Sequence, residues 1–191
     1  MLFSFSLPFI LSLFSAAQQA PASAAAPERV QPQPPAKIEW RANRPLTWAD
    51  FRSRPATDQL AALTSSSIDA KVGCVDYVFS AQVQAVFVPN ESWVRDPKRA
   101  TPNLLRHEQL HFDLTEVHAR LLRQKLSLVK LDCEKLQPAF NNITKMAFLT
   151  WQREEARYDQ ETNHGLNLPR QQAWEQQTQQ RLQQLEAFAL K

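Results

Sequence analysis

Two histidines and a glutamate in the stretch His107-Glu108-Gln109-Leu110-His111 have types and spacing suited to metal-dependent hydrolysis. Residues four apart on a helix lie on one face, so both imidazoles can reach the same ion. Glu108 lies about 100° around the helix, which places its carboxylate beside the open position of the metal. A catalytic zinc ion keeps three protein ligands and a water, whose pKa it lowers. We therefore expect His107 and His111 to bind Zn2+ and Glu108 to act as general base for a metal-activated water.

The third zinc ligand is not fixed by this motif. His118 lies about 10 Å along the helix axis from His111, too far to share its ion. Downstream, His164 could enter from the end of a second helix, and we favour it. Asp159 could instead bind the metal or accept the other ring N–H of a ligating histidine. Glu155 is the third candidate, because Glu155 and Asp159 have the spacing of a glutamate ligand and a supporting aspartate in thermolysin-like enzymes.

Two further side chains near these candidates each have two possible roles. Asp113 could support a metal ligand from behind, or form an ordinary helix salt bridge. Tyr158 could donate a hydrogen bond to the oxyanion of a tetrahedral intermediate, or pack under the C-terminal helix. The chain has only two glycines, Gly73 and Gly165, which excludes glycine-rich phosphate loops, and we expect no organic cofactor.

The elements that must position these residues are strands followed by helices. We expect strands at 38–41, 61–71 and 77–88, a helical turn at 48–52, and helices at 102–131, 140–159 and 168–189. Alternating apolar residues from Tyr77 to Phe87 predict one buried sheet face, with a turn at Gly73 and Cys74 before it. Thr101-Pro102 suits a helix start, and Gly165 suits a helix end. The glutamine-rich stretch 171–184 reads as a solvated helix face. The fold class is α+β, a compact zincin-like domain with a small antiparallel sheet packed on a layer of about three helices.

The N-terminal residues indicate export. Leu2 to Phe14 is an apolar run too short to span a bilayer, and small residues follow it. We expect a signal peptide at 1–17 (with cleavage as late as 24), a flexible Ala/Pro/Gln-rich leader at 18–37, and a zinc-protease-like domain at 38–191. We expect a periplasmic or secreted protein with no stable membrane insertion after signal cleavage. In an oxidising compartment, Cys74 and Cys133 should form a disulfide.

Composition restricts the partners. A formal charge of +3 with 43% hydrophobic residues is typical of a globular protein and too small to favour nucleic-acid binding. An extended polypeptide is the expected substrate, lying beside the 61–71 strand by strand addition. The oligomeric state stays open.

Three segments resemble a bacterial family of predicted secreted zinc-dependent proteases that was first catalogued as a domain of unknown function. They are Pro45–Phe51, Leu104–Asp113 and Tyr158–Gly165, with Gln171 and Trp174 after them. The resemblance covers about residues 38–178. It implies a zinc-protease class without a substrate, and it favours the Tyr158–Gly165 segment over Glu155 as the source of the third ligand.

These observations predict an exported zinc-dependent endopeptidase, a hydrolase that cleaves peptide bonds with Glu108 as general base. One alternative is a cell-wall amide hydrolase with the same metal site. Another is a non-catalytic zinc-containing periplasmic binding or scaffold protein, which a fourth protein ligand closing the site would favour.

Overall fold

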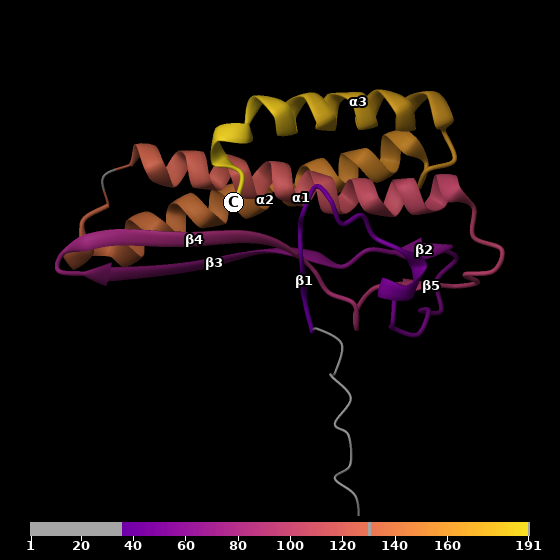
Figure 1. The fold of residues 1–191 in the computed structure, drawn as a ribbon, viewed down its shortest axis with the longest axis horizontal. Coiled ribbons are helices and arrows are strands. Elements are labelled where there is room, and N and C mark those ends of the chain that lie inside the picture. The colour runs from indigo at the N-terminus through magenta and orange to yellow at the C-terminus, as the bar shows by residue number, and fades with distance from the viewer. Residues whose placement is uncertain (1–35, 130, 191) are drawn as a thin grey trace, which may run out of the picture. The chain divides into compact units, whose positions relative to one another are not determined.

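The computed structural model describes residues 36–129 and 131–190, which form an α+β unit (Figure 1). The expected signal peptide and nearly all of the expected leader lie outside these residues. Within them are five strands: β1 (Ile38–Glu39), β2 (Ala62–Leu63), β3 (Ser66–Val75), β4 (Val78–Phe87) and β5 (Trp93–Val94). Three long helices follow: α1 (Pro102–Leu128), α2 (Leu136–Thr162) and α3 (Leu168–Gln184). The short helical turns are η1 (Trp48–Asp50), η2 (Cys133–Lys135) and η3 (Glu186–Phe188).

The strands form two antiparallel sheets rather than one. The larger sheet has the order β1-β4-β3, and β2 pairs with β5 in a separate two-stranded sheet. The expected single strand at 61–71 is therefore wrong, because the chain changes partner between β2 and β3. At the break, the Ser65 N–H donates to the Ser92 hydroxyl and the Val88 N–H donates to the Ser65 carbonyl, both at 2.9 Å.

The β3–β4 hairpin turns three residues later than expected. Val75 pairs with Val78, so the turn is Asp76–Tyr77, and Gly73 and Cys74 lie inside β3. Both turn residues have positive φ, 49° and 60°, as a tight two-residue hairpin requires. The predicted alternation is confirmed at the other end of β4, where residues 83, 85 and 87 are buried, but Tyr77 is 82% exposed.

Helix α1 is the central element of the unit. It begins at the expected cap, where the Thr101 hydroxyl accepts a hydrogen bond from the Leu104 N–H at 3.2 Å and proline follows at the first position. Figure 1 shows the sheet on one side of α1 and α3 on the other, and α1 also packs against α2. Every residue from 114 to 120 is buried, because neighbours cover the helix on several sides. It ends at Leu128, three residues before the expected end.

Cys74 and Cys133 form the predicted disulfide. It joins β3 to η2, immediately before α2, across a sequence separation of 59 residues. The chain-entropy model gives about 4 kcal/mol of stabilisation for a loop of this length. The bond therefore ties the tip of the hairpin to the start of α2.

Helices α2 and α3 are joined by a short left-handed segment. Asn163, His164 and Gly165 all have positive φ and end α2 at Thr162, next to the predicted Gly165 stop and three residues beyond the expected last residue. Helix α2 begins four residues earlier than expected, and α3 stops at Gln184, where the expected longer helix gives way to η3. None of the described helices has the length and apolar character needed to cross a membrane.

Candidate metal centre

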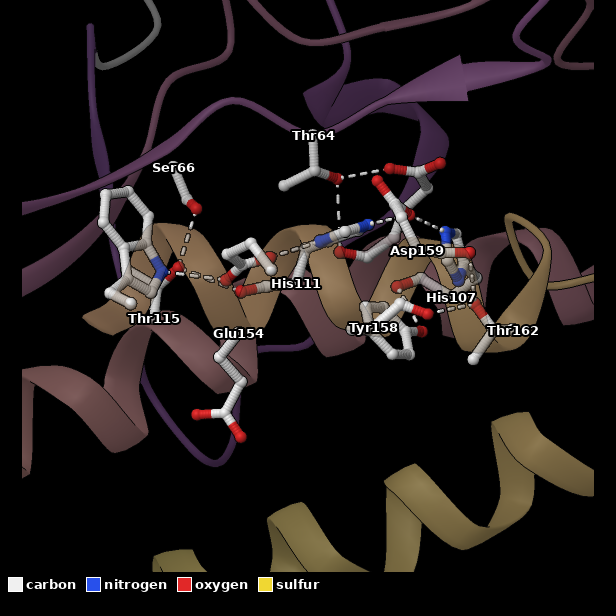
Figure 2. Close-up of polar contacts among 12 residues, drawn as sticks. Thr64, Ser66, His107, His111, Thr115, Glu154, Tyr158, Asp159 and Thr162 are labelled. Carbon is white, nitrogen blue, oxygen red and sulfur yellow. Dashed lines mark hydrogen bonds and ion pairs between the residues drawn. The ribbon is translucent and has the colours of Figure 1, made fainter. Parts of the chain in front are cut away.

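His107 and His111 project from one face of α1 toward Asp159 on α2 (Figure 2). The Asp159 Oδ1 lies 3.1 Å from the Nε2 of each histidine. Among the described residues, these three side chains form the one group whose ligand atoms all lie within 4.8 Å of one another. The two imidazoles therefore lie on one helix face and close enough together to reach the same ion, as the HExxH motif predicts.

The donor set fits a small divalent cation. Neighbouring ligand atoms on a tetrahedral ion with bonds of about 2.0 Å are about 3.3 Å apart. The two N···O distances of 3.1 Å are close to that value. Two imidazoles and one carboxylate are the ligands of many catalytic zinc sites, so the group could hold a zinc ion without large rearrangement.

His111 is oriented by a carboxylate behind it. Its Nδ1 makes a short hydrogen bond with Glu155 Oε2, and Glu155 Oε1 accepts from the Trp151 indole N–H at 2.8 Å. Burial alone would lower the pKa of His111, but hydrogen bonds to Asp159 and Glu155 outweigh it and raise the pKa to about 10. Glu155 thus contacts His111 from behind and stays outside the candidate group, whereas Asp159 belongs to it, which is the reverse of the thermolysin-like assignment of the two roles.

His107 is oriented by Gln171 from α3. The Gln171 Nε2 donates to Glu175 Oε1 at 3.1 Å, so its Oε1 is the acceptor on the other side. That oxygen lies 3.2 Å from His107 Nδ1 and accepts from the Tyr158 hydroxyl at 2.8 Å. Because His107 Nδ1 donates its proton to Gln171, Nε2 is left free to bind a metal. Gln171 is fully buried, so the expectation of a solvated face is wrong at this position.

Tyr158 lies beneath the histidines and not at a substrate-facing surface. It is fully buried, its ring stacks on His107 with centroids 4.8 Å apart, and its hydroxyl is 3.1 Å from the His107 carbonyl oxygen. Burial, opposed only in part by the Gln171 hydrogen bond, raises its pKa well above the ordinary value. This geometry supports a positioning role and does not support the expected oxyanion donor.

His164, the favoured third ligand, lies outside the three-residue group, in which Asp159 meets both histidines. It lies beyond the end of α2, its side chain is 52% exposed, and its Nδ1 is 3.4 Å from Asp159 Oδ1. Asp159 lies inside the helix, one turn earlier, on the face that meets α1. Burial would raise the Asp159 pKa, but hydrogen bonds from His107 and His111 hold it well below its usual range.

Glu108 lies beside the three-residue group without belonging to it. Its side chain is only 3% exposed, yet it lines the adjoining cavity. The Thr64 hydroxyl, just after β2, donates to Glu108 Oε2 at 2.7 Å and fixes one carboxylate oxygen. No described residue makes a hydrogen bond to the other oxygen, Oε1. Nothing in the local sequence pointed to Thr64, since it is 44 residues away from Glu108.

Asp113 has a structural role away from the metal group. Its Oδ1 accepts from the Trp40 indole at 2.7 Å and from Gln109 Nε2 at 2.8 Å, and burial raises its pKa. Gln109 in turn accepts from the Leu46 N–H at 2.6 Å. Asp113 therefore fastens the N-terminal segment to α1, and the expected support of a metal ligand is not found. His118, as expected, lies apart, bonded to Glu154 at 2.6 Å.

A cavity of about 630 Å³ adjoins the group. It follows α1 from His111 back to Thr101 and is bounded opposite by β2 and by the segment around Arg95 and Arg99. Its lining is largely aliphatic, from residues 60–63, 100, 104 and 166. His107, Glu108, Asp159 and His164 also line it, so the group and its neighbouring carboxylate face a space large enough for part of a peptide.

Residues 52–165 match the model of a family described as "Bacterial protein of unknown function (DUF922)". The match includes the HExxH motif, Asp159 and His164, and it stops before α3, which supplies Gln171. Neither a curated protein nor a solved structure matches the chain.

Proposed function

This protein belongs to that bacterial family of unknown function, and we propose that it is a zinc-dependent peptidase. One observation carries the proposal: the His107, His111 and Asp159 group lies beside the buried carboxylate of Glu108 on the wall of a large cavity. Three donors with a basic group next to them is the arrangement that metal-dependent hydrolysis needs.

The same observation favours catalysis over a purely structural metal. Structural zinc sites are closed by four protein ligands, whereas this group offers three. The nearest further candidate, His164, has its Nδ1 3.4 Å from Asp159 Oδ1 and is half exposed at the cavity. A binding or scaffold protein would have no use for a carboxylate buried next to the open side of the group.

A bound zinc ion would lower the pKa of a water and polarise a carbonyl group. We assign the proton transfer to Glu108, whose Oε1 is the oxygen left without a partner among the described residues when Thr64 holds Oε2. Thr64 fixes the carboxylate, so little reorganisation is needed when the proton moves. His164 lines the cavity beside Asp159, and we assign to it the hydrogen bond to the developing oxyanion.

An extended polypeptide is the substrate that the cavity wall suits. Leu63 of β2 pairs with Trp93 of β5, and the Arg95 N–H donates to the Ala61 carbonyl at 2.9 Å. Alternate residues of an antiparallel ladder direct their backbone groups to the partner, so Ala61 and Leu63 face β5. Ala62 therefore directs its N–H and C=O to the opposite edge of β2, where no described strand pairs. A substrate strand could add at that edge, next to Glu108.

Export is part of the proposal. The Cys74–Cys133 disulfide is typical of proteins that fold in an oxidising compartment. We place the protein in the periplasm or outside the cell, where its substrates would be other exported polypeptides or cell-wall peptides.

The experiment compares zinc content with hydrolysis of casein and of purified peptidoglycan. We expect about one zinc per chain in wild type, loss of zinc in Asp159→Ala, and retained zinc without hydrolysis in Glu108→Gln. His164→Ala should keep zinc and lose most activity, and Thr64→Val should keep zinc and lose about tenfold in kcat. Full hydrolysis by Glu108→Gln, or full zinc content in Asp159→Ala, would refute the assignment.

A further inference from the structure

The cavity beside the metal group has two chemically different ends. Its walls near the group are aliphatic, with Leu104 one turn before His107 on the same face of α1. Beyond Thr101, at the amino end of α1, the wall is formed by the charged side chains of Arg95, Asp96 and Arg99. A ligand that fills the cavity must match both parts.

Two of these charged side chains are occupied by the protein itself. Arg95 donates to the carbonyls of Leu60, Ala56 and Asp58 at 2.8–3.1 Å, forms an ion pair with Asp58 and lies over the Trp93 ring. Arg95 thus closes the wall at the 56–60 segment.

Asp96 stabilises the turn that follows. Its Oδ1 accepts from the Lys98 N–H at 3.1 Å, and its carbonyl accepts from the N–H groups of Arg99 and Ala100. No ion pair joins Asp96 to Arg99 among the described contacts. The Arg99 guanidinium is exposed, lines the cavity, and has no hydrogen bond or ion pair to any described residue.

The distance from Arg99 to the metal group determines how many substrate residues would separate the cleaved bond from a side chain that contacts Arg99. Thr101, the cap of α1, and His107 are six residues apart, which is about 9 Å along the helix axis, and Arg99 lies two residues before Thr101. An extended peptide covers about 9–10 Å in three residues. A chain paired with β2 and centred on the metal group would therefore bring its third residue toward the Arg99 end.

We propose that Arg99 is a specificity determinant that selects peptides with an acidic side chain about three residues from the cleaved bond and aliphatic residues between. A guanidinium can bind a substrate carboxylate through two parallel N–H donors. It would repel the positively charged side chain of a lysine at the same position of the substrate. This inference rests on the proposed peptidase function, because the spacing is counted from the metal group.

The test uses blocked peptides with a central leucine and Glu, Gln or Lys three residues away on both sides. Binding is measured to the zinc-loaded Glu108→Gln protein, which should hold substrate without turnover. We expect the Glu peptide to bind on the order of fivefold tighter than the Lys peptide, an effect typical of one exposed ion pair. Adding Arg99→Glu should reverse the order. Adding Lys98→Glu, a change of equal charge in the same loop at a residue that does not line the cavity, should leave it unchanged.

Equal binding of the three peptides, no binding of any of them, or an unchanged order with Arg99→Glu would overturn the inference. Cleavage by the wild-type protein then distinguishes failure of the inference about Arg99 from failure of the peptidase proposal. Cleavage without a charge preference refutes the role of Arg99 and leaves the peptidase proposal intact. A charge preference in binding, with no cleavage by the zinc-loaded wild type, refutes the peptidase proposal instead.

Discussion

Replacing Gly165 by alanine tests how tightly the α2–α3 connection holds His107, the first histidine of the candidate metal group. Gly165 has a φ of +80°, and a Cβ built there would lie 2.9 Å from Cβ and 3.0 Å from Cγ of His107. The backbone conformation alone costs an L-residue about 1 kcal/mol. The close contact is with the base of a side chain on the central helix, which has little room to move, and overpacking of this kind costs about 1–3 kcal/mol.

We therefore expect Gly165→Ala to lower the free energy of unfolding by about 3 kcal/mol. Urea denaturation of the zinc-free protein measures this directly. Any relief of the contact must shift His107, so zinc affinity, measured by competition with a chelator, should also fall by about tenfold or more. The stability change does not depend on zinc binding and tests the packing by itself.

The chain supplies its own control in Gly73, the other glycine. A Cβ there would meet the Ser80 hydroxyl at 3.4 Å, an ordinary contact, in the interior of β3. Gly73→Ala should leave zinc affinity unchanged and stability within about 1 kcal/mol of wild type. If the two alanine variants had the same stability and the same zinc affinity, the close packing of Gly165 on His107 would be refuted.

Two further predictions concern Gln171, which contacts His107, and Glu154, which bonds His118 and Arg181 away from the candidate metal group. Gln171→Met removes the hydrogen-bond acceptor for His107 while keeping the side-chain volume, so zinc affinity should fall by about tenfold to a hundredfold. The control, Gln172→Met on the exposed face of α3, should not change zinc affinity. Equal zinc affinities of the two variants in a chelator competition would contradict this prediction. The pKa of Glu154 is lowered from its ordinary value of 4.5 to about 2 because hydrogen bonds from His118 and Arg181 outweigh burial, which by itself would raise it. A carboxyl with a lowered pKa in the folded protein contributes stability above pH 4.5 that is lost as the pH falls toward 2. Wild type should therefore exceed Glu154→Gln by about 1–2 kcal/mol at pH 6, after allowance for solvent screening, and the difference should shrink on acidification, as urea denaturation between pH 6 and pH 3 would show.

Local sequence was sufficient for the features that depend on one segment of chain. The spacing of His107 and His111 places both imidazoles on one helix face wherever that helix lies, and the Thr101 cap starts the helix within the sequence itself. The disulfide followed from there being only two cysteines in a chain that indicates export. These predictions needed no knowledge of how the helices pack.

The remaining members of the site were decided by contacts between distant segments. Asp159, His164 and Glu155 all lie near the end of α2, and only the way in which α2 packs on α1 makes Asp159 meet both histidines while Glu155 reaches behind one of them. Gln171 and Thr64 come from other elements, 64 and 44 residues from the motif side chains that they hold. Helical spacing fixes the direction of a side chain relative to its own axis. The rotation and height of one helix against another depend on the whole core. The sequence therefore left open which side chain joins the two histidines and which groups orient them, and only the tertiary structure brings Asp159, Gln171 and Thr64 to them.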